Sequence, residues 1–275
     1  MSLFNFNQEE MFSFFVVLVR FGVLCTVLPF IGDRFVPGPV KVLFALCVSF
    51  ALFPALVSGR QIRPSDSHVW AASAGGIVGM IGVEAVFALI LGYTARLVFD
   101  TVNLGSNLMG NFMGFAMAST YDPHQESQTE VVAEFQMAIA MLLFLAIDGH
   151  HLLLRASLDS YRIVGMGGLA AIGNGGFGPL FSEKIIELTG QVFRLGIQLA
   201  APVAIALFAV NVAFGVFAKA MPQLNVFVLS FAVSAVVGLI VMFLCIPEFQ
   251  SAVISIFEHT EEWMNVIMRS IAGSH

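Results

Sequence analysis

Apolar residues in this sequence form continuous runs, and most of the polar residues fall between the runs. The runs cover 11–31, 40–57, 69–99, 131–147, 185–218 and 224–246. Several of them match or exceed the ~20 residues that a helix needs to cross the hydrocarbon core of a membrane. A membrane β-barrel would instead need ~10-residue segments in which apolar and polar residues alternate. The pattern therefore predicts an all-α membrane protein, in which 69–99 forms either two segments or one long tilted helix.

The stretch 103–123 departs from this pattern. It is rich in glycine and asparagine, and it carries no charged residue before Asp122. Each glycine lowers helix propensity by about 1 kcal/mol relative to alanine, so we expect the segment to bend. Its methionines recur every four residues and fall near one helical face, where flexible thioethers can form an adaptable apolar seal. These methionines are Met109, Met113 and Met117.

Two interpretations of this stretch remain open. It forms either a moving constriction or a small-residue helix that packs tightly in a bundle, with Gly110 and Gly114 on the close-approach face. Residue types alone favour the packed helix. In either case Asp122-Pro123 ends the segment, because the residue before a proline is pushed out of the helical region.

Glycine and proline also divide the rest of the chain. A glycine-rich connector covers 165–178; it contains a formal GxGxxG match, but no strand precedes it, so it does not predict a nucleotide site. The short connection 219–223 predicts an antiparallel hairpin between the last two long runs. The final stretch, 248–275, predicts an amphipathic tail.

Composition narrows the class of protein further. The chain has 275 residues, of which 58% are hydrophobic and 11% charged, and its mean hydropathy is +0.91. Soluble domains carry about 25% charged residues. The net charge of −6 and the absence of a basic stripe argue against a nucleic-acid partner. Cys25, Cys47 and Cys245 lie in apolar runs without CxxC spacing, which predicts buried free thiols.

Three charged residues interrupt the apolar runs: Arg20, Glu84 and Arg96. A charge at that depth normally faces protein or a watery cavity. Glu84 could carry protons or form a structural ion pair with Arg20 or Arg96, and we favour the ion pair because no second acid is near. Lys and Arg are spread over nearly every loop and give no clear orientation. The chain therefore looks built to pack against other polypeptides.

The sequence offers little support for catalysis. Serines occur without a Gly-x-Ser-x-Gly motif, and no acid pair flanks an obvious pocket. His150 and His151 are adjacent, and adjacent residues on a helix point in different directions. We therefore expect them to cap a helix C-terminus, where imidazolium favours the dipole, rather than to bind metal. We predict no catalytic, cofactor or metal residues.

A set of residues keeps a characteristic order and spacing over nearly the whole chain. The most specific part is Ala201-Pro202, then Gly215, then MPQLNVF at 221–227. The other matches are Arg20, Pro29-Phe30, Gly32, Val36-Pro37, Lys41, Leu52-Phe53-Pro54, Glu84, Gly92, Gly105, Gly114, Asp122-Pro123, Phe144-Leu145, Asp148-Gly149-His150-His151 and Ser160-Tyr161. In this order and spacing the chain resembles the FliR family of flagellar export-gate proteins and its counterparts in virulence injectisomes.

The resemblance implies hydrophobic helical hairpins that assemble with other subunits into a helical cone rather than an isolated transmembrane bundle. It implies a single domain over 1–275, with an N-terminal part, 1–181, and a C-terminal hairpin and tail, 182–275. It further implies one copy per export gate in the bacterial inner membrane, within the flagellar basal body and its ring. The implied partners are FliP, FliQ, FlhB, FlhA, membrane lipid and unfolded flagellar export substrates.

The resemblance also assigns roles to particular residues. It implies a channel plug made of Gly105, Met109, Gly110, Phe112, Met113, Gly114, Phe115, Met117, Asp122 and Pro123. It implies a cytoplasmic-entrance hairpin that includes Lys219, Met221, Pro222, Gln223, Asn225 and Phe227. We expect the three charges in apolar runs, Arg20, Glu84 and Arg96, to be buried for assembly. The alternatives are an injectisome export protein and a small-solute secondary transporter, which would need repeated halves around a polar midplane site.

Overall fold

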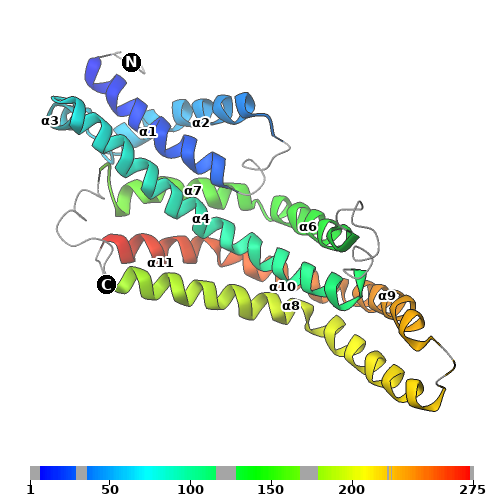
Figure 1. Cartoon of the computed structure of the whole chain (residues 1–275). Helices are drawn as coiled ribbons and strands as arrows, with labels where there is room; N and C mark the ends of the chain where they lie inside the picture. The colour runs from blue at the N-terminus through cyan, green and yellow to red at the C-terminus, as the bar shows by residue number, and fades with distance from the viewer. Residues whose placement is uncertain are drawn as a thin grey trace. The chain divides into compact units, whose positions relative to one another are not determined.

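The computed structural model describes residues 7–28, 36–115, 128–167, 179–221, 223 and 225–272. Within these ranges the chain forms helices and turns and has no strand, which confirms the all-α prediction (Figure 1). The elements are α1 (Gln8–Val27), α2 (Gly38–Ser58), the 3₁₀ helix η1 (Pro64–Asp66), α3 (Ser67–Trp70), α4 (Ala74–Phe112), α6 (Gln128–Ala146), α7 (Gly149–Ile163), α8 (Pro179–Ala220), α9 (Val226–Leu244), α10 (Ile246–Glu258) and α11 (Thr260–Ala272).

The helices group into two compact units. Unit 1 contains Met1–Leu97, His150–Leu188 and His259–His275, and unit 2 contains Val98–Gly149 and Thr189–Glu258. The chain passes between the units several times, so each unit combines segments from distant parts of the sequence. The single domain over 1–275 stays a prediction.

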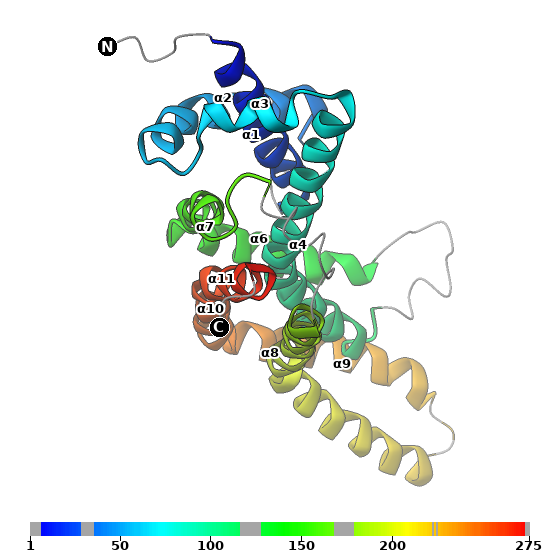
Figure 2. The same ribbon diagram turned by 90° about the vertical axis from the view of Figure 1, so that its left-hand side faces the viewer.

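Unit 1 has a core in which α1 packs along α2 (Figures 1 and 2). Asn7 caps α1, because its Oδ1 accepts a hydrogen bond from the backbone N–H of Gln8 at 2.8 Å. Pro54 lies inside α2, and the helix continues beyond it. The buried core residues are Val17, Phe21, Phe53, Leu56, Ile62 and Tyr161.

Two helices are longer than a membrane crossing requires. α4 has 39 residues and α8 has 42, whereas about 20 residues span the hydrocarbon core. The run 69–99 therefore contains one long helix, preceded by the short α3. Among the described residues, four helices, α1, α2, α4 and α8, are long and apolar enough to cross a membrane, or up to six if each bent pair of successive helices counts as one span.

In unit 2, aromatic rings join α4, α6 and α10. The ring centroids of Phe99, Phe144 and Phe257 lie 4.8 to 5.2 Å apart. α4 also approaches α8 closely: a Cβ added at Gly105 would lie 2.9 Å from the carbonyl oxygen of Gly196. Two helices can approach this closely only because neither glycine carries a side chain.

The structure corrects two expectations about smaller features. His150 and His151 lie in the first turn of α7, so they do not cap a helix C-terminus, and their ring centroids are only 4.2 Å apart. The chain reaches α7 through Asp148, whose φ is +56°. Among the free cysteines, Cys25 is buried as expected, but Cys47 is exposed.

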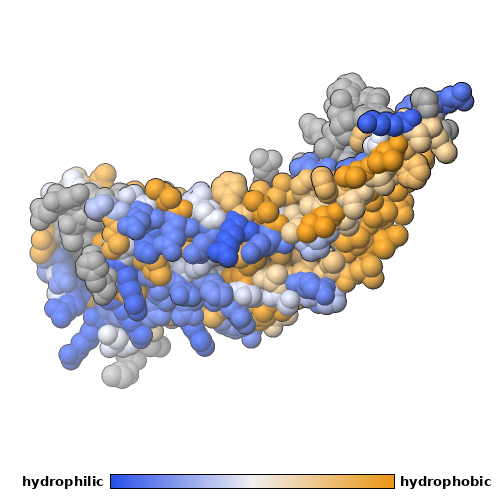
Figure 3. All heavy atoms as spheres, turned by 90° about the horizontal axis from the view of Figure 1, so that it is seen from below, coloured by the Kyte–Doolittle hydropathy of each residue, from blue (hydrophilic) through white to orange (hydrophobic). Residues whose placement is uncertain are grey.

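The second half of α8 and much of α9 leave large apolar side chains exposed. Figure 3 shows the second half of α8 as a continuous hydrophobic surface. On α8 the exposed residues are Ile205, Phe208, Val212, Val216 and Phe217, and on α9 they are Val228, Leu229, Val236, Ile240, Phe243 and Leu244. Apolar surface of this extent marks contact with lipid or with another protein.

Candidate functional site

The predicted plug segment begins as the last turns of α4. Helix α4 continues without interruption to Phe112, so the expected bend does not occur at Gly105 or Gly110, which are both buried. The helix ends in a turn at Met113 and Gly114, where φ of Gly114 is +85°. Three predicted plug residues, Met117, Asp122 and Pro123, lie outside the described residues.

Two of the three methionines are buried inside unit 2. Met109 is 3% exposed, and its Sδ accepts a hydrogen bond from Nε2 of Gln136 at 3.0 Å. Met113 is 1% exposed and covers Gly238 of α9, where an added Cβ would lie 2.5 Å from Met113 Cγ. This part of the segment therefore matches the packed-helix interpretation. Phe112, by contrast, is 47% exposed.

Gly114 makes the turn that follows α4. A side chain is unfavourable at its positive φ, and an added Cβ would lie 3.0 Å from Cδ1 of Phe231 on α9. The glycines of the segment therefore have different roles. Gly105 allows α4 to approach α8, whereas Gly114 allows the backbone to turn beside α9.

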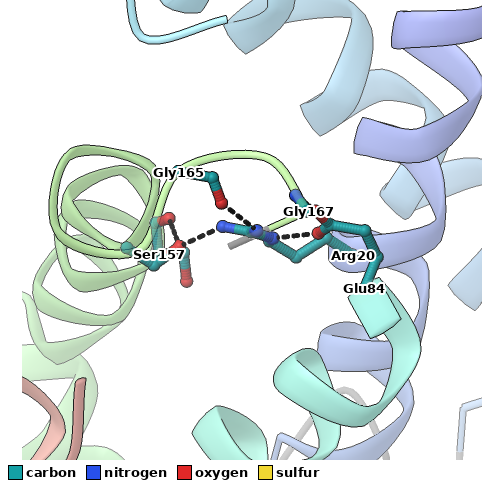
Figure 4. A network of polar contacts seen from close by, with 6 residues as sticks. Arg20, Glu84, Ser157, Gly165 and Gly167 are labelled. Carbon is teal, nitrogen blue, oxygen red and sulfur yellow. Dashed lines mark hydrogen bonds and ion pairs between the residues drawn. The ribbon is translucent and has the colours of Figure 1, made fainter. Parts of the chain in front are cut away.

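In unit 1, Arg20 of α1 and Glu84 of α4 form a buried ion pair (Figure 4). Arg20 is 1% exposed and Glu84 is 0% exposed, and Arg20 Nε donates to Glu84 Oε2 at 2.5 Å. The remaining guanidinium nitrogens donate to Ser160 Oγ at 3.0 Å and to the carbonyl oxygen of Gly165 at 2.9 Å. The other oxygen of Glu84 accepts the backbone N–H of Gly167 at 2.8 Å.

Aromatic rings complete the surroundings of this pair. The guanidinium carbon of Arg20 lies 3.7 Å from the ring centroid of Tyr161 and 4.6 Å from that of Phe87. Burying two charges is costly unless they pair and their hydrogen-bonding groups are satisfied. Here the charges pair, and each guanidinium nitrogen and each carboxylate oxygen makes at least one hydrogen bond, so Glu84 already has its countercharge within this chain. Arg96, the other expected partner, is exposed.

The ion pair also fixes the chain after α7. Gly165 and Gly167 have φ of +67° and +70°, a conformation that glycine adopts readily. Arg20 holds the carbonyl of the first and Glu84 the amide of the second. The pair therefore joins α1, α4 and the end of α7.

The predicted entrance hairpin connects α8 and α9. Lys219 lies in the last turn of α8, where a cation favours the helix dipole. Asn225 caps α9 by accepting the N–H of Val228 at 3.4 Å. Met221 and Gln223 are exposed. Pro222 and the side chain of Phe227 lie outside the described part of the chain.

Comparison with known proteins identifies the family. Residues 11–260 match the profile of "Bacterial export proteins, family 1". The chain belongs to this family. Relatives of this chain carry the name "Flagellar biosynthetic protein FliR". These relatives support a role for this chain in flagellar export. The family is named for export and its relatives for flagellar biosynthesis, and neither name is that of an enzyme.

These relatives match nearly end to end. The Bacillus subtilis (strain 168) protein is 26% identical over 262 residues, which are 95% of this chain and 96% of the relative. The Escherichia coli (strain K12) protein is 28% identical over 85% of this chain and 84% of its own length. The Aquifex aeolicus (strain VF5) protein is 22% identical over 88% of each chain. Together with the apolar helices, they indicate a membrane protein of the flagellar export apparatus.

Sequence reasoning missed several residues of this family 1 export protein that the structure brings together. Gln136, Phe231 and Gly238 contact the plug segment, and Ser160, Gly165 and Gly167 bind the ion pair. Gln136 carried a usable signal, since it is a polar residue inside the apolar run 131–147. Ser160 was among the residues that carried the resemblance, but no role was assigned to it. The remaining residues gave no signal, because their partners are far away in the sequence.

Proposed function

We propose that this protein is a subunit of the flagellar type III export gate. With FliP and FliQ, it forms the channel through which unfolded flagellar proteins cross the bacterial inner membrane. One copy completes each gate in the basal body, with FlhB beside the entrance hairpin and FlhA nearby. The proton gradient and a separate ATPase supply the energy.

The observation that carries this proposal is the exposed apolar surface of α8 and α9. In the most apolar 18-residue window of α8, only 22% of the residues are buried within this chain. Lipid or neighbouring subunits must cover the apolar side chains that this chain leaves exposed. Subunits that complete a multi-chain conduit need this surface for their neighbours.

The Arg20–Glu84 pair supports a structural role for the buried charges. A proton-carrying carboxylate needs access to water or to a relay of titratable groups. Glu84 is fully buried, and both of its oxygens accept hydrogen bonds within unit 1. We propose that the pair stabilises the helices that assembly requires. The exposed Arg96 contacts a neighbouring subunit in this scheme.

We further propose that the segment from Gly105 to Pro123 closes the channel when no substrate passes. Met109 and Met113 anchor the segment to the helices of unit 2, and the apolar exposed ring of Phe112 faces the conduit. Apolar constrictions hold back ions by excluding water. The turn at Gly114 lets the segment move without unfolding α4.

A deletion strain tests the proposal. Cells without this protein should build no filaments and release no hook or filament protein into the medium, and the intact gene should restore both. Tagged protein purified in mild detergent should bring FliP and FliQ with it. Normal flagellar secretion in the deletion strain, or a purified chain that transports a small solute by itself, would overturn the proposal. Loss of effector secretion with normal motility would instead indicate an injectisome.

A further inference from the structure

A pocket in unit 2 lies beside Met109 of the predicted plug segment. Its volume is about 310 Å³, which is at the lower end of the ~300–1,000 Å³ typical of ligand pockets. The wall contains mostly apolar side chains from α4, α8, α9 and α10. They include Met109, Leu199, Val203, Met242, Phe249 and Ile256, all of them buried.

The pocket contains one buried acceptor without a partner. Gln136 is 3% exposed, and its Nε2 donates to Met109 Sδ. Its Oε1 has no hydrogen-bond partner among the described residues. Leaving a buried acceptor unsatisfied is costly, so an occupant that donates one hydrogen bond here gains affinity.

The other polar groups of the pocket lie at its rim. Gln198, Glu248 and Ser255 line the pocket but are exposed. A lysine or arginine side chain that reached Gln136 would lose its water, and none of the buried lining residues is a carboxylate that could compensate its charge. This cost disfavours either residue as the occupant. An acyl chain would fill the apolar wall but could not donate a hydrogen bond.

Water is also a poor occupant. A well-held buried water makes two to four hydrogen bonds. Among the buried side chains that line the pocket, the Gln136 amide is the polar group available to it. A ligand that displaces such a weakly held water gains affinity.

The occupant that fits is an aromatic ring carrying one neutral donor. Tyrosine and tryptophan bury a large apolar body and direct one O–H or N–H to a partner, and both are enriched at protein interfaces. The surface of α8 and α9 near the pocket is also apolar, because Ile205 on α8 and Phe243 and Leu244 on α9 are exposed.

We propose that this pocket receives a tyrosine or tryptophan side chain from another polypeptide. The ring packs against the apolar wall, and its O–H or N–H donates to Oε1 of Gln136. The inference rests on the proposed function in one respect, because it needs a neighbouring subunit. The pocket itself can be tested on the isolated chain.

The test uses the full chain in detergent with Cys47→Ser. The remaining thiols are then the buried Cys25 and the half-buried Cys245, which lines the pocket. The alkylation rate of Cys245 by N-ethylmaleimide reports occupancy. The probes are p-cresol and p-xylene, which have nearly the same shape but differ in the O–H donor. We expect p-cresol to protect Cys245 at about five- to tenfold lower concentration than p-xylene, as expected for one hydrogen bond to a buried acceptor.

Matched variants assign the effect to Gln136. Gln136→Leu should abolish the preference for p-cresol, whereas Gln198→Leu, at the exposed rim, should keep it. Ala252→Phe should fill the pocket and remove protection by both probes, whereas Ala213→Phe, at an exposed position on α8 that is not among the lining residues, should not.

If Gln136→Leu fails to fold, the Ala252→Phe comparison still decides whether the probes bind in this pocket. Equal protection by both probes, or protection that survives Ala252→Phe, would overturn the inference.

A second measurement identifies the occupant in the assembled apparatus. A photo-cross-linking residue at Glu248, on the rim, should form adducts with a polypeptide segment that contains tyrosine or tryptophan next to the linked site. Adducts to a segment without either residue, or to lipid alone, would contradict the inference. The two proposals fail separately. Equal protection of Cys245 by p-cresol and p-xylene in the chain with an unchanged Gln136, together with normal export, rejects the pocket, whereas normal flagellar secretion without the chain rejects the proposed function.

Discussion

Met113 lies directly over Gly238, so that the end of α4 touches the backbone of α9. The space between them is too small for a methyl group, because an added Cβ would come within 2.5 Å of Met113 Cγ. A flexible thioether usually adapts to its surroundings. Here it is held at 1% exposure against a helix backbone.

Gly238→Ala should therefore destabilise the chain, although alanine favours helices. Overpacking costs about 1–3 kcal/mol, while the gain in helix propensity is about 1 kcal/mol. Because Gly215→Ala gains the same helix propensity, we expect the free energy of unfolding in detergent to be about 1–3 kcal/mol lower for Gly238→Ala than for Gly215→Ala. Gly215 is a suitable control because nothing lies within 4 Å of its added Cβ. A Gly238→Ala chain at least as stable as this control would show that Met113 moves aside freely.

Gly114→Ala should weaken the turn after α4. Its φ of +85° costs an L-residue about 1–2 kcal/mol, and the methyl group would also press on Phe231. A strain carrying this variant should swim more slowly and export less filament protein, and Gly114→Glu should block export. Gly75→Ala, on the exposed start of α4 with open space around it, serves as the control. A fully motile Gly114→Glu strain would contradict a closing role for this turn.

Glu84→Gln should leave the Arg20 charge buried without a partner. Removing one member of a buried pair costs about 3–5 kcal/mol, because the remaining charge stays desolvated. We expect a lower unfolding temperature and less folded protein in membranes. Arg20→Met combined with Glu84→Gln should recover part of that loss, and Glu183→Gln at an exposed position should have little effect.

The same variants separate a structural role from a proton-carrying one. If Glu84→Gln folds and assembles normally but abolishes export, the carboxylate takes part in transport. If export falls only in proportion to the amount of folded protein, the pair is structural. Both oxygens of Glu84 accept hydrogen bonds within unit 1, which leads us to expect the second result.

Replacing Met109, Met113 and Met117 with glycine should raise ion leak through the assembled gate. The first two anchor the segment inside unit 2, so removing their side chains leaves cavities and releases the turn at Gly114. Leak can be measured as conductance in planar bilayers or as growth inhibition by external salts. The same three positions changed to leucine keep apolar volume and should leak less. Tight channels with the glycine variants would count against a plug.

The sequence predicted the all-α fold correctly, because continuous apolar runs of about 20 residues rarely form anything other than helices. The run 131–147 lies almost entirely within α6, and 224–246 encloses α9. Of the glycines in the segment that was expected to bend, Gly105 stays helical because α4 packs closely on Gly196 there, and the chain turns only at Gly114. α7 was missed, since its serines, histidines and arginines interrupt the apolar pattern.

For the candidate site, the sequence predicted the types of interaction but not which residues make them. The types of residue at positions 20 and 84 already indicated an ion pair, and that pair is present. They are 64 residues apart, so the sequence could not choose between Arg20 and Arg96 as the partner of Glu84. The burial of Met109 and Met113 could not be read from their spacing, because the same stripe suits a lumen or a core. Only the packing against Gln136 and Gly238 separates the two.

The hydrogen bonds from Arg20 to Gly165 and from Gly167 to Glu84 also bear on which changes of chain length the protein tolerates. These two hydrogen bonds fix the position of the backbone directly after α7. Residues inserted downstream of Gly167 would leave both hydrogen bonds intact. Variants with more or fewer residues after Gly167 should therefore still fold, provided that Arg20, Glu84, Gly165 and Gly167 remain.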